Sequence, residues 1–598
     1  MTYPSRQFQQ TDPPAPTGGV PGGTVRRQSV SRGFRACVVG VALVLVAAAC
    51  GGGGSDNGDG GSSGGPKGEA EVSGKPTLGG SVVYGLEANT SGGWCLAEAQ
   101  LVISGIQVAR AIYDTLTAPG ADGEIHPFLA ESVTPNAEAT EFTIKLRSGI
   151  KFSDGSDLTA QVVANNLDAY RGTYPARSPL LFKFVFSDVD TVSVVDPLTV
   201  KVTTKVPWPA FPWFLWGSAR IGIMGQAQLD SANCPTDLVG TGPFVKENFE
   251  AGPSGKFVAK KNPNYWWKDK DGTPYPYLDQ ITFQANESGP DRLKSLQAND
   301  YQMIHTSGPL QIIDIRKDKN IRSIESDKYG EVSYQLLNTT KEPFSYQSAR
   351  DATAYAVDRD TVNQTRNGGI LKQASGPFAP GSVGFVEDTG LPTKADIEKS
   401  KAAQAEYKRQ TGKDLTFTLT TGADPETLKT AELLQSMWAA AGIRVDLQSI
   451  GDQTQYLNQA IGKQFEAILW RNHPGGDPDL QYVWWHCGNG SGSAPADPNA
   501  PACDNAVNFS GFNDPVLNTL MEKGRSSLNE AERKQAYEDL NREFAKQRYS
   551  LWGQWTLWAI AFQPNIHGVL GPDLPDGTAP WPGLGTGAPV QALWQAKG

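Results

Sequence analysis

The sequence predicts an α/β protein with several mixed sheets and more than one domain. The chain has 598 residues, which is more than a single compact hydrophobic core usually serves. Segments with alternating apolar residues, typical of strands, take turns with segments that place apolar residues every three or four positions, typical of helices. We find no internal repeat, so the alternation indicates successive domains of mixed type.

The N-terminal region has the composition of an export signal. Four arginines between positions 26 and 35 precede an uncharged, mostly apolar stretch from Ala36 to Ala49. This stretch is shorter than the roughly 20 apolar residues that a membrane-spanning helix needs, and its surroundings are typical of a secretory signal peptide. We therefore expect residues 1–49 to be a removable signal.

Cys50 follows this stretch directly. The sequence from Val46 to Cys50, Val-Ala-Ala-Ala-Cys, resembles the lipobox of bacterial lipoproteins, in which the cysteine is acylated, with palmitate among its lipids, and becomes the mature N-terminus. The resemblance implies an exported protein that is lipid-anchored at Cys50 to the outer face of the cytoplasmic membrane. The alternative is an ordinary signal peptide in which Cys50 has no special role.

The residues after Cys50 have the composition of a tether. Eleven of the 26 residues from Gly51 to Pro76 are glycine, and most others are Ser, Asp, Glu or Lys. Such a segment buries too little apolar surface to fold by itself, so we expect residues 50–77 to stay flexible. The formal net charge of the chain is −10, which argues against nucleic acid as a partner and against a purely electrostatic hold on anionic lipid.

Strand and helix signals begin just after the tether. A strand is expected at 81–85, and a half-buried strand at 142–146, where apolar and polar residues alternate. A helix should start at Thr159, because apolar residues then recur at helical spacing. Two valine-rich runs on either side of Asp196-Pro197 predict a hairpin.

The same signals continue in the second half of the chain. Residues 433–441 form one apolar helical face that Gly442 should end, and residues 443–447 return to the alternation of a strand. Near the C-terminus, the four residues from Ser527 to Glu530 read as a capping box at the start of a further helix.

Four cysteines remain once the signal and the lipidated residue are set aside. An even number of cysteines in an exported chain favours disulfides, for which three connectivities exist. Cys487 and Cys503 enclose a Gly-, Ser-, Pro- and Asn-rich loop, so we pair them locally, and Cys95 with Cys234 follows by elimination. A zinc site that includes His486 is the rival hypothesis, but the spacing of two CxxC pairs is missing.

Signatures of enzymes are scarce, and no cofactor or metal motif stands out. The G-x-S-x-G matches lie in the tether, where they reflect composition, and the chain has neither a phosphate-binding P-loop nor a His-Glu-x-x-His motif. Tryptophan, by contrast, is abundant, with 15 residues. Clustered aromatic residues pack cores more often than they bind ligands, but they also line ligand sites. We expect a binding protein and not an enzyme.

Several ordered motifs resemble one family, the extracellular solute-binding proteins of the peptide/nickel class that serve ABC importers. The resemblance covers roughly residues 78–570 and rests on these stretches: HPFLAESVTPNAEATEFTIKLRSGIKFSDGSDLTAQVV (126–163), VGTGPF (239–244), KNPNYWW (261–267), LLNTTKEPFSYQSARDATAYAVDRD (336–360) and AAAGIRVDLQSI (439–450). It implies a two-lobed, periplasmic-binding-protein-like fold of type II that encloses a ligand between its lobes.

The resemblance also implies a division of the chain. Lobe I would comprise residues 78–335 with an extra subdomain inserted at about 110–230, and lobe II residues 336–559. Residues 560–598 would return to lobe I.

The ligand would contact the segment 469–487. In peptide-binding relatives an aspartate just after the tryptophan of this segment holds the ligand's α-amino group, but here no acidic residue precedes Asp477. We therefore expect Arg471 to receive a carboxylate or other anionic group, and a free amino terminus to matter less. Alternatively, Asp477 reaches the place of that aspartate and holds the amino group. The expected ligand-binding residues are Trp470, Arg471, His473, Asp477 and Trp485 from lobe II, and Glu87 and Asn89 from lobe I.

The function implied is that of a substrate-binding lipoprotein that captures a peptide or peptide-like solute and delivers it to the permease subunits of an ABC transporter. We expect it to act as a monomer. One alternative is a relative that has given up transport and acts as a regulatory or interaction lipoprotein of the cell envelope. A secreted hydrolase is a further alternative.

Overall fold

The structure is a computed structural model of the chain, and it describes residues 75–88, 93–99, 101–179, 181–252, 254–451, 453–472, 475–488, 503 and 505–597. The predicted signal peptide, the lipidation site Cys50 and almost all of the predicted tether lie outside these residues. So do two of the expected ligand-binding residues, Asn89 and His473.

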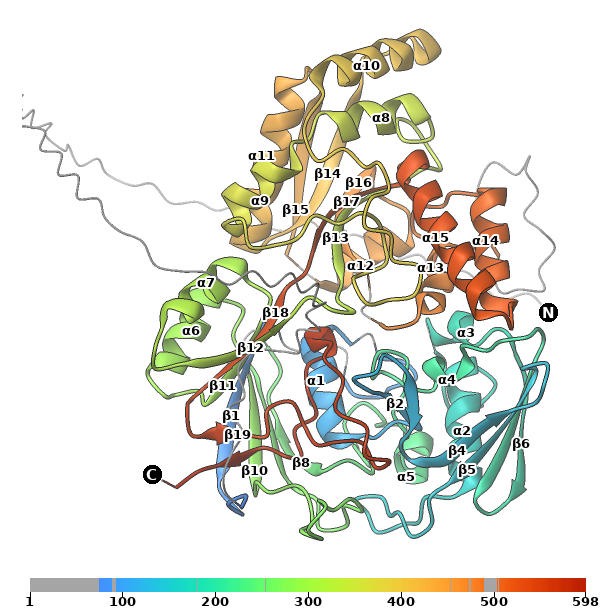
Figure 1. The fold of residues 1–598 in the computed structure, drawn as a ribbon, viewed down its shortest axis with the longest axis vertical. Helices are drawn as coiled ribbons and strands as arrows, with labels where there is room; N and C mark the ends of the chain where they lie inside the picture. Colours follow the sequence, from blue (N-terminus) through green and yellow to red (C-terminus); the bar gives the residue numbers. More distant parts are fainter. Residues whose placement is uncertain are drawn as a thin grey trace, which may run out of the picture. The chain divides into compact units, whose positions relative to one another are not determined.

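A seven-stranded mixed sheet forms the centre of the body that we call lobe I (Figure 1). The strand order is β12-β18-β11-β1-β10-β9-β8, and β1 runs parallel to its neighbours β10 and β11. The strands are β1 (Ser81–Leu86), β8 (Phe244–Phe249), β9 (Lys256–Lys261), β10 (Gln280–Ala285), β11 (Met303–Thr306), β12 (Arg322–Ser326) and β18 (Trp558–Phe562). The side chains that follow β1 and β11 therefore meet at one edge of the sheet.

A four-stranded antiparallel sheet lies between β1 and β8 in the sequence, and we call the part of the chain that carries it the insert. Its order is β4-β5-β7-β6, with β4 (Ala130–Pro135), β5 (Glu141–Leu146), β6 (Val189–Asp196) and β7 (Thr199–Thr204). A small pair, β2 (Thr117–Pro119) with β3 (Ile125–Pro127), precedes it. One hydrophobic core includes residues of the seven-stranded sheet and of the insert, so lobe I and the insert form one body.

A second mixed sheet forms the centre of lobe II. Its order is β15-β14-β16-β13-β17, with β13 (Val332–Leu337), β14 (Thr416–Gly422), β15 (Arg444–Ile450), β16 (Ala467–Arg471) and β17 (Ser550–Trp555). Strands β13 and β16 run antiparallel, and their register places Ser333 opposite Arg471. Two further apolar cores belong to this lobe.

The helices complete both lobes (Figure 1). Lobe I and the insert carry α1 (Ile103–Ile112), α2 (Ala160–Arg171), α3 (Phe182–Val185), α4 (Phe211–Phe214), α5 (Gln226–Asp230), α6 (Gly289–Gln297) and α7 (Pro309–Lys317). Lobe II carries α8 (Gln347–Tyr355), α9 (Arg359–Asn367), α10 (Ile397–Thr411), α11 (Pro425–Ala440), α12 (Gln453–Ile461), α13 (Tyr482–Trp485), α14 (Pro515–Ser526) and α15 (Glu530–Gln547).

The chain crosses between the two sheets twice. It leaves lobe I after β12 and enters lobe II at β13, and it returns between β17 and β18. The two crossings are joined, because the Thr556 amide donates a hydrogen bond of 2.9 Å to the Glu331 carbonyl. After the return, the C-terminal segment forms the small pair β19 (Ile566–His567) and β20 (Trp594–Gln595) on the side of lobe I.

Several sequence-based expectations are confirmed at the level of single elements. The predicted hairpin is β6 and β7, in which Val194 lies opposite Val200, and the Asp196 carboxylate accepts a hydrogen bond from the Leu198 amide in the turn. Helix α2 begins after Thr159, whose hydroxyl accepts a hydrogen bond from the Val162 amide.

The predicted capping box at Ser527 is wrong by two residues. The N-cap of α15 is Asn529, whose side chain accepts a hydrogen bond from the Glu532 amide. The Ser527 hydroxyl instead accepts a hydrogen bond from the Asn529 amide, so it shapes the turn before the helix. An asparagine side chain caps a helix as well as serine does, which is why the sequence pattern did not separate them.

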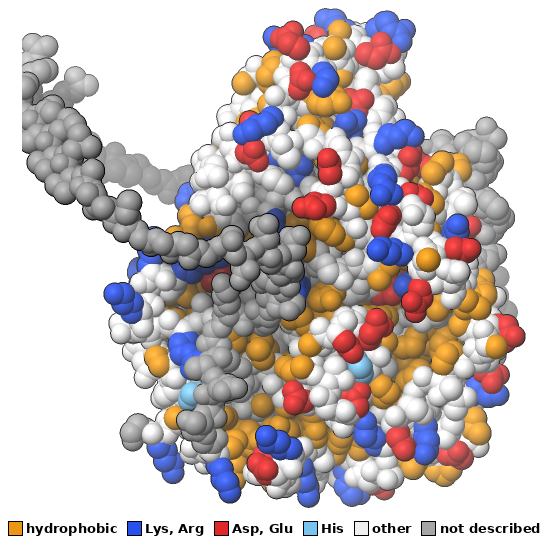
Figure 2. Space-filling model, viewed as in Figure 1, with side chains coloured by type: hydrophobic (Ala, Val, Ile, Leu, Met, Phe, Trp, Pro, Cys, Tyr) orange, Lys and Arg blue, Asp and Glu red, His pale blue; other side chains and the backbone are white. Residues whose placement is uncertain are grey.

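The surface carries charges of both signs. Figure 2 shows Lys and Arg side chains interspersed with Asp and Glu over the visible face, without a broad field of one sign. Among the described residues, no helix is both long enough and apolar enough to span a bilayer.

Candidate functional site

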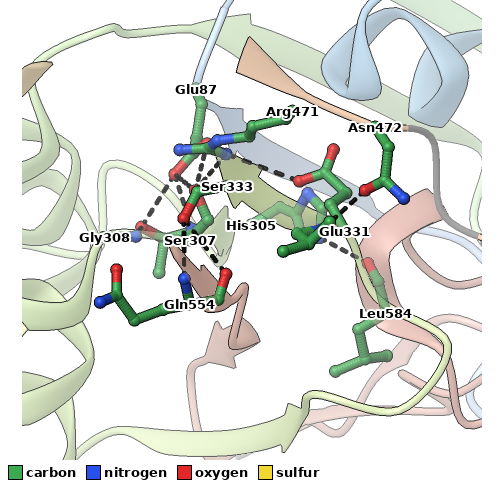
Figure 3. A network of polar contacts seen from close by, with 12 residues as sticks. Glu87, His305, Ser307, Gly308, Glu331, Ser333, Arg471, Asn472, Gln554 and Leu584 are labelled. Carbon is green, nitrogen blue, oxygen red and sulfur yellow. Dashed lines mark hydrogen bonds and ion pairs between the residues drawn. The ribbon is translucent and has the colours of Figure 1, made fainter. Parts of the chain in front are cut away.

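Glu87 lies at the end of β1, where the sheet of lobe I meets the crossing to lobe II (Figure 3). Its carboxylate accepts hydrogen bonds from the Ser307 amide at 2.6 Å and the Thr306 hydroxyl at 3.2 Å. Arg292, which is almost fully buried, reaches the same carboxylate at 3.2 Å. Glu87 is thus held in place by groups that follow β11 and by a cation from α6.

Arg471 is the last residue of β16 and comes from lobe II. One of its guanidinium nitrogens, Nη1, lies 3.4 Å from the Ser307 hydroxyl and 3.6 Å from Oε2 of Glu331. The side chain is 51% exposed, so about half of its surface is accessible to solvent or to a solute. Glu87, Ser307, Glu331 and Arg471 (Figure 3), together with Arg292, form what we call the interlobe network.

Burial and charge set opposite protonation preferences for the two acids of this network. Burial alone raises the pKa of Glu87, but Arg292, Arg471 and the Ser307 amide outweigh it and hold this pKa below its usual value. Burial raises the pKa of Glu331 to about 7, against the effect of Arg471. Glu87 is therefore an anion at neutral pH, while Glu331 exchanges a proton in that range.

His305 lies below the network on β11 and does not titrate near neutral pH. Its ring stacks on Trp558 at 4.2 Å between centroids, and its Nε2 lies 2.9 Å from the Leu584 carbonyl, so Nε2 carries the proton and donates it. Burial lowers the pKa of His305 to about 4. The neutral imidazole ties the C-terminal segment to the sheet of lobe I.

An aromatic cluster lies against the loop that follows Arg471. Trp581 from the C-terminal segment stacks on Tyr329 at 3.9 Å and contacts Trp213 of the insert at 5.9 Å. Gly476 approaches so closely that a Cβ there would lie 2.4 Å from Trp213 and 2.9 Å from Trp581. The tryptophan-rich run that includes Trp213 was visible in the sequence, but nothing marked Trp581, Tyr329 or Glu331, because the crossing and the chain return bring them to this place.

Of the expected ligand-binding residues, the structure brings together Glu87 and Arg471. Trp470 precedes Arg471 on β16, and its ring stacks on Tyr456 at 5.9 Å. His473 and Asn89 lie outside the described residues.

The structure places Asp477 and Trp485 elsewhere. The Asp477 carboxylate pairs with Arg533 at 2.5 Å and caps the 3₁₀ helix Pro478–Gln481. Trp485 is 5% exposed and packs among Phe544 and other aromatic residues in the core of lobe II. Their local surroundings satisfy both side chains, which gives each a structural role that the sequence did not reveal.

The cysteines differ from one another in the structure. Cys95 and Cys234 form the disulfide that we expected. Cys487 and Cys503 are buried neighbours but are present as thiols, and the Cys503 thiol donates toward the His486 carbonyl at 3.8 Å. The hydrogen bond with Cys487, together with burial, raises the pKa of the Cys503 thiol. The structure thus lacks the second expected disulfide.

No cluster of three or more His, Cys, Asp or Glu side chains suited to a metal ion occurs in the part of the chain that the structure describes.

Comparisons with known proteins agree on the fold. The chain is 24% identical to the binding protein AgaA of A. tumefaciens R10 in complex with agropinic acid, with a TM-score of 0.73 over 87% of this chain and 99% of that one. The oligopeptide-binding protein AppA of Bacillus subtilis, in complex with a nonapeptide, gives 19% identity and a TM-score of 0.72 over 88% and 100%. The fold is the two-lobed periplasmic-binding-protein fold of type II.

Sequence relatives point the same way. The chain is 30% identical over 281 residues to the glutathione-binding protein GsiB of Salmonella paratyphi A, which is 47% of this chain and 52% of that protein. It thus spans about half the length of the curated relatives that it matches. The family model for bacterial extracellular solute-binding proteins, family 5, middle part, matches residues 124–494. The chain belongs to family 5 of the bacterial extracellular solute-binding proteins.

Proposed function

We propose that this protein is the extracytoplasmic substrate-binding component of an ABC importer. It captures a peptide or peptide-like solute between lobe I and lobe II and delivers it, as a monomer, to the permease subunits. Its membership of family 5 supports the role of a binding protein. The names of its relatives, which mention glutathione and a nonapeptide, support a solute with peptide character.

The position of Arg471 carries the more specific part of the proposal. The residue belongs to lobe II, yet its guanidinium reaches Ser307 of lobe I and remains half exposed. A group bound there would be held by both lobes at once, as a hinged receptor requires.

The charges around Arg471 favour an anionic solute group. The charge of Glu87 is already matched by Arg292, and Glu331 carries only part of a negative charge at neutral pH. Arg471 therefore retains positive charge that Glu331 balances only in part. A guanidinium binds a carboxylate through two parallel hydrogen bonds, so a carboxylate of the solute is the group that fits best.

Calorimetry with matched peptide pools tests this proposal. One pool of tripeptides has free ends, the second is N-acetylated, and the third has C-terminal amides. We expect N-acetylation to change the affinity less than threefold, and amidation or Arg471→Met to weaken binding at least tenfold. Arg542→Met, on an exposed face of α15, is the control. A hundredfold loss of affinity on N-acetylation, about 2.7 kcal/mol, would show that the amino group of the solute is the main anchor. The carboxylate at Arg471 would then not be the dominant contact.

The lipid anchor is a second part of the proposal. The lipobox-like residues that end at Cys50 and the glycine-rich residues after it support attachment to the outer face of the membrane. Cys50→Ser should release the protein into the medium or leave the precursor uncleaved. Normal cleavage together with unchanged membrane retention would contradict this part and leave the binding function untouched.

A further inference from the structure

Glu331 is a buried acid with an unused oxygen at the centre of the interlobe network. The residue is 4% exposed and lies on the first crossing, just before β13. Its Oε2 receives no hydrogen bond from the described residues, and the nearest cation, Nη1 of Arg471, is 3.6 Å away. A buried carboxylate oxygen without a hydrogen-bond donor lowers the stability of the folded protein, so such an oxygen in a native structure calls for a functional explanation.

The groups that face Glu331 come from four parts of the chain. Arg471 on β16 and Arg220 of the insert favour its charged form, and Glu87 after β1 opposes it. The fourth group is the uncharged indole of Trp558 on β18, which also favours the charged form of Glu331. Burial outweighs the two arginines and leaves the pKa of Glu331 at about 7. His305 on β11 stays neutral over this range.

A solute carboxylate on Arg471 would change this balance. It would bring a second negative charge to a guanidinium that Glu331 already faces. Two carboxylates that share one site do not both stay ionised, because repulsion raises the pKa of one of them. Glu331 is the more deeply buried acid, so the proton goes to Glu331.

We propose, on the basis of the proposed function, that Glu331 is a positioning residue. When the carboxylate of the solute binds Arg471, Glu331 takes up one proton from the solvent and no longer competes for the guanidinium. The O–H bond that forms on Glu331 replaces the O–H or N–H bond of the solvent or buffer acid that gives up the proton, and the solute is unchanged. The substrate class that follows is a solute with a carboxylate, which is captured as its anion together with a proton.

This coupling has a defined dependence on pH. Below about pH 7 Glu331 is protonated with or without solute, so the affinity does not vary. Above that pH the free protein must gain a proton on binding, and each further pH unit weakens binding up to tenfold. The loss levels off above the pKa that Glu331 has in the complex.

The experiment uses the pool of N-acetylated tripeptides with free carboxyl ends, made without His or Cys so that the probes do not titrate between pH 6 and 9. Binding is measured by calorimetry at each pH, and in two buffers of different ionisation enthalpy to count protons. We expect the native protein to take up close to one proton at pH 8 and to lose ten- to hundredfold in affinity between pH 7 and 9. Glu331→Gln should bind without proton uptake and with a flat profile. Glu325→Gln, which alters an exposed pair with Arg316, is the control and should behave like the native protein.

The possible outcomes separate the two proposals. Tight binding of the carboxylate pool with a flat pH profile and no proton uptake in the native protein would overturn the role of Glu331 and leave the receptor assignment standing. Equal binding of the amidated pool would overturn it too, because the carboxylate would then not lie at Arg471. No binding of any peptide pool would count against the proposed function itself. Proton counts on the native protein decide the matter even if Glu331→Gln does not fold.

Discussion

Arg525 of α14 donates a hydrogen bond of 2.7 Å to the carboxylate of Asp188 in the insert, and neither side chain is more than 2% exposed. The same guanidinium reaches Asp479 of lobe II at 2.9 Å and lies over the ring of Tyr482. Apolar residues of α3 pack on a core of lobe II beside it. Lobe II is thus attached to lobe I at a second place, away from the two crossings.

Removal of Arg525 should destabilise the protein strongly. Arg525→Ala leaves Asp188 and Asp479 buried without their cation, and the loss of one partner from a buried pair costs about 3–5 kcal/mol. Urea unfolding measures the change. Arg542→Ala removes an exposed pair on α15 and should cost less than 1 kcal/mol. Equal losses for the two variants would mean that the buried contact contributes nothing special.

A side chain at position 476 should prevent the close approach of the loop after β16 to the aromatic cluster. A Cβ on Gly476 would lie 2.4 Å from Trp213, so Gly476→Ala forces the loop away. We expect weaker solute binding, by roughly tenfold, with little change in the stability of each lobe. Gly451→Ala, where the nearest atom is 3.5 Å away, is the matched control. Unchanged binding in Gly476→Ala would show that the loop does not take part in capture.

The Cys95–Cys234 disulfide should contribute measurably to stability. Its residues are 139 positions apart, and the loop-entropy model gives about 5 kcal/mol for closing a loop of this length. Denaturant unfolding with and without reductant checks this value. Peptide mapping without reductant should find Cys95 joined to Cys234, and Cys487 and Cys503 as reduced thiols. A Cys487–Cys503 bridge in the exported protein would contradict the thiol state of this buried pair.

His126 forms a pH-dependent tie between β3 and the C-terminal segment. Its Nε2 lies 3.0 Å from Asp122 and its Nδ1 2.8 Å from Asp576. Burial alone lowers the pKa of His126, but the two carboxylates outweigh it and raise this pKa above its usual value. The stabilisation is therefore fully present below about pH 6.5, the ordinary pKa of histidine, and is lost as the pH rises through the higher value of the folded protein.

The size of this tie is modest because both carboxylates are partly exposed. We expect His126→Ala to cost about 0.5–1 kcal/mol at pH 6 and almost nothing at pH 9. Thermal unfolding of the variant and of the native protein at both values gives the difference. A loss that is the same at pH 6 and pH 9 would show that packing, and not charge, accounts for the contact.

The sequence predicted what depends on neighbours along the chain. The turn at Asp196 and the start of α2 at Thr159 follow from local backbone chemistry. Glu87 and Arg471 were also expected in the site, from a family resemblance and their positions after strands. What escaped was set by pairing between distant segments. The contact of β13 with β16 brings Glu331 beside Arg471 across 140 positions, and no pattern in either segment shows it.

The misplaced expectations have a similar cause. Asp477 looked like a candidate anchor because it was the first acid after Trp470, but its partner Arg533 lies on a helix that the chain reaches 56 residues later. The sequence alone does not distinguish Trp485, a core tryptophan, from a tryptophan that contacts ligand. Only the packing of α13 against the rest of lobe II decides which of the two it is.

The hydrogen bond between Thr556 and Glu331 has a mechanical consequence. It makes the two crossings a short two-stranded ribbon, which bends more easily than it shears or stretches. Two bodies that are joined by such a ribbon and also by the contact at Arg525 keep only one easy motion, a rotation about the line through both attachments. Glu331 lies on the ribbon itself, at this axis. When Glu331 takes up a proton, the charge of the ribbon changes close to the rotation axis. Residues at the axis move little when the lobes rotate, so solute binding alters charge at a place that hardly moves.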